Sequence, residues 1–175
     1  MSHTVLSFDL DNTLWDVDKI IIRAEKLMQS WLQANAPDSL AHYDADNLGT
    51  FRAQVTQDHP DQVHDLSFMR IEVLRHLMRH TGYDDNQAHT LAHDAFEVFF
   101  QARNEVDFYA GAQEMLQTLS EQFDLYALTN GNADIQRAGL DRYFRGAMNS
   151  AEAGAKKPDP RIFHALNAKS NLPVD

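Results

Sequence analysis

Two aspartates near the N-terminus, Asp9 and Asp11, follow a short apolar run from Val5 to Phe8 that is long enough for a buried strand. Side chains two positions apart project from the same face of an extended segment, so we expect the two carboxylates to lie close together. Like charges this close repel unless a cation or a shared proton lies between them. The spacing therefore suits one aspartate as a nucleophile, the other as an acid and base, and Mg²⁺ as the neutralising ion.

A strand that runs into an Asx-rich turn is the simpler interpretation, because Asp and Asn favour turns and short motifs match by accident. Two later stretches favour the chemical one. The run Leu125–Gly131 ends in Thr-Asn-Gly, and the run Glu152–Pro160 carries a lysine, Lys157, directly before a proline. Taken in order with Asp9–Leu14, these stretches resemble the first three motifs of the haloacid dehalogenase-like (HAD) hydrolase superfamily.

The resemblance implies roles for both aspartates. Asp9 would attack phosphorus and become an aspartyl phosphate, and Asp11 would protonate the leaving alkoxide and then activate water. Mg²⁺ would be held by the Asp9 carboxylate and the Asp11 backbone carbonyl. Dehalogenases of this superfamily lack an aspartate at the Asp11 position, so its presence favours phosphoryl transfer over dehalogenation, which stays the alternative within the superfamily.

The second and third motifs imply a phosphate-binding set. Thr129 would offer its hydroxyl, and Asn130 and Gly131 would offer backbone N–H groups. Lys157 would balance the negative charge of the phosphate and of Asp9. Lys156 is the rival lysine, but the family lysine directly precedes proline, so we assign the role to Lys157.

A fourth motif of the superfamily, an acidic pair written Gly-Asp-x(3-4)-Asp, would complete the Mg²⁺ shell. The sequence ends at Asp175, which no glycine precedes, so the role cannot be carried over to it. We expect the intact domain to be a monomer. A 1–175 product is expected to be poorly active, to bind Mg²⁺ weakly, and to associate through the sheet edge beside Val5–Phe8.

The pattern of elements predicts an α/β fold with a helical insert. Residues 16–106 read as helical throughout, and strands alternate with helices after them, which indicates a parallel sheet. We therefore predict a Rossmann-like HAD core from 1–15 and 107–175, with a helical cap at 16–106. The expected helices cover about 16–34, 48–55, 65–82, 84–106, 111–119, 134–138 and 159–169, and the later strands cover 125–128 and 147–149.

Composition excludes several classes of function. The net charge of −11 argues against a broad nucleic-acid surface. No run approaches the roughly 18 apolar residues of a membrane span. The absence of cysteine excludes disulfides and fits a reducing compartment. Without a basic segment followed by an apolar one at the N-terminus, we expect no signal peptide and a cytoplasmic protein.

Histidines support a different interpretation of the helical insert. His76 and His80, like His89 and His93, are four residues apart on predicted helices, a spacing that can bind Zn²⁺. A non-catalytic helical metal-binding or interaction module is therefore the alternative function. It leaves the three ordered motifs unexplained, and we favour solvated helix surface for both pairs.

The substrate is expected to be a small phosphorylated metabolite. The run ending at Asn132 and the helix start at His64–Asp65 are similar to bacterial phosphatases that act on flavin mononucleotide and on 5-amino-6-(5-phosphoribitylamino)uracil. Arg70, on that helix, is a candidate cap contact for substrate, although an exposed helix arginine is the simpler interpretation. Trp15 is placed either beside an aromatic substrate ring or in the core.

Overall fold

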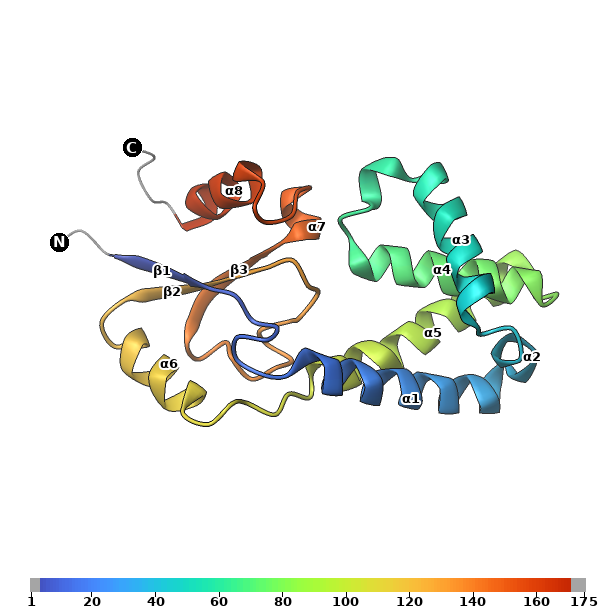
Figure 1. The fold of residues 1–175 in the computed structure, drawn as a ribbon, viewed down its shortest axis with the longest axis horizontal. Coiled ribbons are helices and arrows are strands. Elements are labelled where there is room, and N and C mark those ends of the chain that lie inside the picture. Colours follow the sequence, from blue (N-terminus) through green and yellow to red (C-terminus); the bar gives the residue numbers. More distant parts are fainter. Residues whose placement is uncertain (1–3, 171–175) are drawn as a thin grey trace. The chain divides into compact units, whose positions relative to one another are not determined.

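The computed structural model describes residues 4–170, which form two compact units (Figure 1). The core unit joins the N-terminal residues up to Ile20 to the residues from Asn104 onward, and the helical unit is Ile21–Arg103. The predicted insert, 16–106, included short flanks that pack with the core unit. The core unit is therefore made of two segments far apart in the sequence.

Three parallel strands form the sheet of the core unit. They are β1 (Val5–Phe8), β2 (Asp124–Thr129) and β3 (Phe144–Asn149), in the spatial order β1-β2-β3. Phe8 lies opposite Ala127, and Thr129 lies opposite Asn149, so the carboxyl ends of all three strands meet at one edge. The predicted parallel α/β fold is confirmed, and β3 begins earlier than the sequence suggested.

Helices cover both faces of this sheet. Successive side chains of β2 point to opposite faces of the sheet, so they join different apolar clusters. Leu125 packs with Leu116 of α6 (Ala112–Ser120), whereas Leu128 packs with Ile162 of α8 (Pro160–Ser170). A short helix, α7 (Ser150–Ala153), follows β3 directly. The two-sided burial of β2 explains why its sequence is nearly continuously apolar.

The helix predicted around residues 134–138 is wrong. The segment makes one helical hydrogen bond, from the N–H of Ala138 to the carbonyl of Asp134 at 2.9 Å, and remains a turn. Gly139 follows with φ of 69°, a left-handed conformation that ends the turn. Forming one helical turn restricts several backbone dihedral angles in return for a single hydrogen bond, so a turn this short is not stable as a helix by itself. Contacts with the rest of the core unit therefore hold the segment in place.

Helices and the short loops between them make up the insert, and the described chain has no strand between residues 16 and 106. They are α1 (Val17–Asn35), α2 (Pro37–Leu40), α3 (Ala45–Asp58), a short 3₁₀ turn η1 (Pro60–Gln62), α4 (Leu66–His80) and α5 (Asp85–Asn104). Asp65 caps α4 by accepting hydrogen bonds from the backbone N–H groups of Ser67 and Phe68. None of the described helices is long and apolar enough to cross a membrane.

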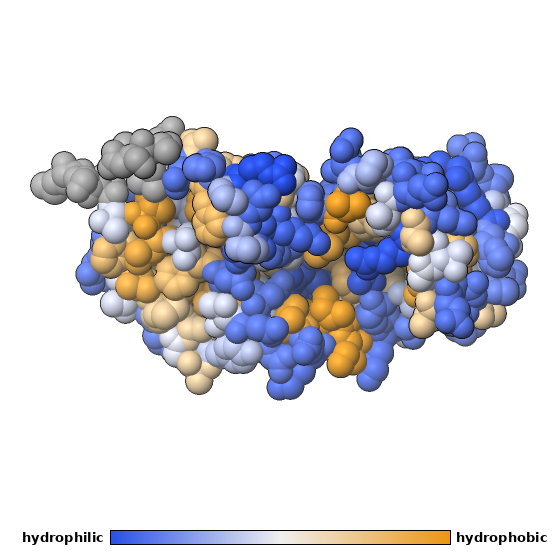
Figure 2. Space-filling view, turned by 45° about the horizontal axis from the view of Figure 1, so that its top comes forward, coloured by the Kyte–Doolittle hydropathy of each residue, from blue (hydrophilic) through white to orange (hydrophobic). Residues whose placement is uncertain are grey.

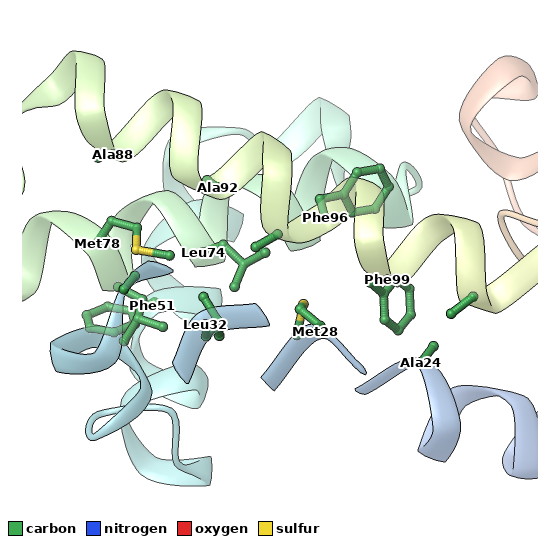
Figure 3. Packing of buried hydrophobic residues seen from close by; sticks show 14 residues of the cluster. Ala24, Met28, Leu32, Phe51, Leu74, Met78, Ala88, Ala92, Phe96 and Phe99 are labelled. Carbon is green, nitrogen blue, oxygen red and sulfur yellow. The ribbon is translucent and has the colours of Figure 1, made fainter. Parts of the chain in front are cut away.

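The core of the helical unit is built by α1, α3, α4 and α5 (Figure 3). Met28 and Leu32 of α1 are fully buried, and they pack in one cluster with Leu74 and Leu77 of α4 and Phe99 of α5. The face of this unit that Figure 2 shows is mostly hydrophilic. The unit therefore has an apolar core of its own, independent of the sheet.

Candidate active site

A tight loop after β1 carries the two aspartates. Leu10 is buried, while Asp9 and Asp11 on either side of it are half-buried. The Leu10 carbonyl accepts hydrogen bonds from the N–H groups of Thr13 and Leu14 at 3.1 and 2.8 Å. Asp9 and Asp11 therefore stand at the carboxyl edge of the sheet, where ligands bind in open parallel sheets.

Asn12 shapes the same loop. It has φ of 59°, a left-handed conformation that Asn tolerates better than most residues. Its N–H donates to the Trp15 carbonyl at 2.9 Å, and its side-chain oxygen accepts from the N–H of Val17 at 3.1 Å. Asn12 thus closes the aspartate loop and starts α1.

Lys157 pairs with the first aspartate. Its Nζ lies 2.7 Å from Asp9 Oδ1 and donates to the Leu128 carbonyl at 2.6 Å. The Asp9 side chain remains 40% exposed, whereas that of Lys157 is 23% exposed. Lys156 is exposed on the loop. The lysine next to proline therefore lies at the ends of both β1 and β2, with Asp9 still accessible to a ligand.

Trp15 pairs with the second aspartate. The Trp15 side chain is fully buried, and its indole Nε1 donates to Asp11 Oδ1 at 2.8 Å. The indole packs edge-on against Phe108, with ring centroids 5.8 Å apart. From the sequence, Trp15 was expected only in the core or beside an aromatic substrate ring. A buried indole N–H needs a hydrogen-bond acceptor. The Asp11 carboxylate, four residues earlier in the sequence, was the feature from which this contact could have been predicted.

Asn130 connects the second motif to the third. Its side-chain oxygen accepts from the backbone N–H of Lys157 at 2.7 Å, and its side-chain nitrogen donates to the Lys157 carbonyl at 3.2 Å. The Asn130 carbonyl accepts from the hydroxyl of Ser150 at 3.0 Å. The sequence predicted a role only for the Asn130 backbone N–H. Its amide side chain, with one donor group and one acceptor, fixes the backbone of Lys157.

Thr129 and Gly131 are joined by a hydrogen bond at the end of β2. Thr129 ends β2 and is 1% exposed, and its Oγ1 accepts from the N–H of Gly131 at 2.9 Å. The N–H of Gly131 therefore has a partner within the loop, and phosphate binding by Thr129 and Gly131 stays a prediction. The Thr129 hydroxyl keeps its own hydrogen to donate.

The resemblance implies the Asp9 carboxylate and the Asp11 backbone carbonyl as oxygen ligands of a cation, and the structure places both residues in the loop after β1. No group of three or more His, Cys, Asp or Glu side chains that could hold a metal occurs among residues 4–170. Mg²⁺ is often held by one or two carboxylates, with substrate phosphate and water supplying the other oxygens. The half-exposed Asp9 carboxylate is the type of ligand that Mg²⁺ prefers. Asp175, weighed above for the fourth motif, lies outside the described residues.

Arg70 is partnered within the helical unit. Its guanidinium forms an ion pair with Glu25 and lies 3.7 Å from the ring centroid of Phe99. Glu25 also accepts from the hydroxyl of Tyr43 at 2.7 Å, and burial with this carboxylate raises the pKa of Tyr43. The Arg70 side chain is 28% exposed. Its charge is thus largely balanced, and a substrate contact stays a prediction.

The histidine pairs lie on α4 and α5. The rings of His89 and His93 are exposed, with centroids 4.4 Å apart. His76 Nδ1 lies 3.3 Å from the side-chain oxygen of Gln54, and partial burial lowers the pKa of His76. Within the part of the chain that the structure describes, neither pair gains a third metal-ligating side chain.

Comparison with known proteins places this geometry in a family. A family model described as haloacid dehalogenase-like hydrolase matches residues 3–173. The 5-amino-6-(5-phospho-D-ribitylamino)uracil phosphatase YigB of Escherichia coli K12 is 29% identical over 171 residues, covering 98% of this chain and 71% of that protein. A phosphoserine phosphatase of Thermus thermophilus is 35% identical over 100 residues, covering 54% of this chain and 39% of that protein.

A crystal structure of a 2-haloacid dehalogenase from Pseudomonas syringae pv. Tomato DC3000 is 34% identical, with a TM-score of 0.92. The match covers 99% of this chain and 75% of that one. Relatives named as phosphatases and a relative named as a dehalogenase thus both match this chain. The chain belongs to the haloacid dehalogenase-like hydrolase family and is a hydrolytic enzyme.

Proposed function

We propose that the protein hydrolyses phosphomonoesters through an aspartyl phosphate on Asp9. The observation that carries this proposal is the separate pairing of the two carboxylates: Asp9 with Lys157 at 2.7 Å, and Asp11 with Trp15 at 2.8 Å. A nucleophile and an acid need different environments. Here one carboxylate has a cation beside it and the other has a neutral donor.

In the first step, an Asp9 oxygen attacks phosphorus and the bond to the leaving oxygen breaks. Lys157 offsets charge on the transferred group, because its Nζ lies at the end of β2 beside Asp9. Asp11 in its acid form gives its proton to the departing alkoxide, which leaves as an alcohol. The product of this step is an acyl phosphate on Asp9.

In the second step, water attacks the same phosphorus. Asp11, now a carboxylate, takes a proton from the water, and the bond between phosphorus and the Asp9 oxygen breaks. Inorganic phosphate leaves, and both aspartates return to their starting forms. We propose that the Thr129 hydroxyl, at the end of β2, binds a phosphate oxygen.

Mg²⁺ is the cofactor we propose, held by the Asp9 carboxylate and the Asp11 carbonyl. When bound, it supplies positive charge against the phosphate and the nucleophile. Two aspartates with one lysine leave the loop short of positive charge. A dianionic ester would otherwise meet an unfavourable local field in a protein of net charge −11.

The substrate class we propose is a small phosphorylated metabolite. Two relatives are named as a 5-amino-6-(5-phospho-D-ribitylamino)uracil phosphatase and a phosphoserine phosphatase. These names support the choice of a small phosphate ester as substrate. Flavin mononucleotide, the pyrimidine intermediate and phosphoserine are therefore the first compounds to compare. Nucleic acid and membrane lipid are not proposed as partners.

Dehalogenation is the second candidate, favoured by the 2-haloacid dehalogenase at 34% identity. In that reaction Asp9 would attack carbon and halide would leave without a proton. It gives Asp11 no acid role in the first step, and so does not account for a carboxylate held by a buried indole. We therefore rank phosphate ester hydrolysis above it.

One pair of assays tests the proposal. The full chain is incubated with Mg²⁺ and p-nitrophenyl phosphate, and separately with 2-chloropropionate, while phosphate and chloride release are measured. We expect phosphate release that needs Mg²⁺ and disappears in Asp9→Asn. Chloride release without phosphate release would replace this proposal by the second candidate. Loss of neither activity in Asp9→Asn would overturn both.

A further inference from the structure

We propose that Trp15 is a positioning residue for the acid and base of the reaction, an inference that rests on the proposed phosphatase function. The indole N–H donates to Asp11 Oδ1 at 2.8 Å, four residues away in the same loop. This bond joins a fully buried ring to a half-buried carboxylate. The ring therefore belongs to the core, while the carboxylate it holds faces the site.

The indole is fixed on several sides. Trp15 pairs through its backbone with Asp11 on one side and Phe108 on the other, and its ring packs edge-on against the Phe108 ring. The Trp15 carbonyl also accepts from the N–H of Asn12 at 2.9 Å. A donor held this firmly loses little conformational freedom when it binds a carboxylate, so it restricts the rotation of the Asp11 side chain.

The chemistry of indole gives this contact a direction. An indole N–H only donates, so Asp11 Oδ1 must act as an acceptor toward it. The proton that Asp11 transfers to the leaving oxygen is therefore best placed on Oδ2. In this way Trp15 selects which carboxylate oxygen faces the leaving group, and a general acid must be within hydrogen-bond reach of the oxygen it protonates.

Leaving-group dependence separates this role from a purely structural one. An alkoxide is a poor leaving group and needs the proton from Asp11, whereas p-nitrophenolate leaves without much help. Losing the indole N–H should therefore slow phosphorylation by an alkyl phosphate more than by p-nitrophenyl phosphate. General loosening of the core would slow both esters alike.

The experiment measures single-turnover phosphorylation with both esters in the wild type and in Trp15→Phe. We expect roughly a 10-fold to 100-fold loss with the alkyl ester, the range for a hydrogen bond to a group that becomes charged as it gives up its proton. With p-nitrophenyl phosphate the loss should stay below about threefold. Trp31→Phe, at the other tryptophan of the chain, is the matched control and should change neither rate.

Two further variants keep the test decisive. Replacing Trp15 by 3-benzothienylalanine keeps the shape of the ring and removes the N–H. This variant can therefore be used for the same rate comparison if Trp15→Phe does not fold. In an Asp11→Asn background, Trp15→Phe should no longer change the ratio of the two rates, because residues that act as a unit are not additive.

Two outcomes contradict the inference in distinguishable ways. An unchanged rate ratio in both folded Trp15 variants would overturn the positioning role and leave the proposed function standing. A wild-type chain that is phosphorylated by neither ester would overturn the proposed function first, and the inference with it.

Discussion

The core unit and the helical unit partner their charged side chains in different ways. In the core unit, Lys157 and Trp15 hold two carboxylates at the edge of the sheet, and Asp9 stays 40% exposed. In the helical unit, Arg70 is paired with Glu25 and stacked on Phe99. Charges are thus presented to a ligand in one unit and balanced internally in the other.

From this difference we expect the core unit to carry out the reaction and the helical unit to affect which substrate is bound. Substitutions at the loop of the core unit should change turnover with little change in folding. Substitutions in the helical unit should first change stability, and should affect turnover only through substrate binding. The following predictions test that division.

The largest effect is expected at Asp9. Asp9→Asn removes the nucleophile, and we expect hydrolysis of p-nitrophenyl phosphate to fall on the order of 10⁴-fold or more, as when a covalent catalyst is removed. Steady-state phosphate release measures it. Asp18→Asn, on the exposed first turn of α1, is the control and should keep full activity.

Lys157 and Lys156 form a matched pair. Lys157→Met removes the cation beside Asp9, and the expected loss in kcat is about 10²-fold to 10³-fold, as for loss of a group that stabilises developing charge. Lys156→Met changes an exposed loop residue and should leave kcat as it is. Equal losses in both variants would contradict the assignment of Lys157.

Leu77 tests the independence of the helical unit. Its side chain is fully buried in the α1, α3, α4 and α5 cluster, so Leu77→Ala should reduce the free energy of unfolding by about 2–5 kcal/mol. Urea denaturation measures the change. Leu27→Ala, at a side chain 45% exposed, should change it by less than about 0.5 kcal/mol.

Arg70 tests the specificity role of the helical unit. If Arg70 contacts substrate, Arg70→Gln should raise KM for flavin mononucleotide about tenfold, as for a lost hydrogen bond to a charged group, and barely raise it for p-nitrophenyl phosphate. Glu25→Gln breaks the same ion pair from the other side. Identical KM changes in the two variants would assign Arg70 to the structure of the unit alone.

The smallest effect concerns pH. Burial lowers the pKa of His76, with Arg79 adding to this and Glu72 opposing it. The unfolded chain then binds a proton more readily than the folded one, so stability should fall as the pH drops below the ordinary His value of about 6.5. Urea midpoints at about pH 7.5 and about pH 5.5, values taken on either side of that pKa, should differ less in His76→Gln than in the wild type.

The sequence predicted the core unit well because its signals are local. An apolar run followed by polar residues marks the end of a strand, and parallel strands bring such ends to one edge. The positions of Asp9, Asp11 and Lys157 at that edge follow from order along the chain. The left-handed Asn12 and the shape of the loop were beyond this reasoning, because they depend on backbone geometry.

Contacts between side chains were not predictable in the same way. The amide of Asn130 on the backbone of Lys157 depends on how two loops approach one another, and the indole of Trp15 on Asp11 depends on the conformation of a single loop. In the helical unit, the sequence predicted that the insert is helical, but not that Glu25 of α1 would meet Arg70 of α4. Pairing across elements requires their relative placement, which a one-dimensional pattern does not contain.

The central claim is that Asp9 is the residue that becomes phosphorylated. Asp11→Asn should slow hydrolysis of the intermediate, so acid quench of this variant during turnover of p-nitrophenyl phosphate, followed by peptide mass spectrometry, tests the claim most directly. We predict one phosphoryl group on the peptide from the N-terminal strand, located at Asp9 and absent in the Asp9→Asn, Asp11→Asn double variant. A phosphoryl group on a different residue, or ester consumption by the double variant at the rate of Asp11→Asn, would contradict the account.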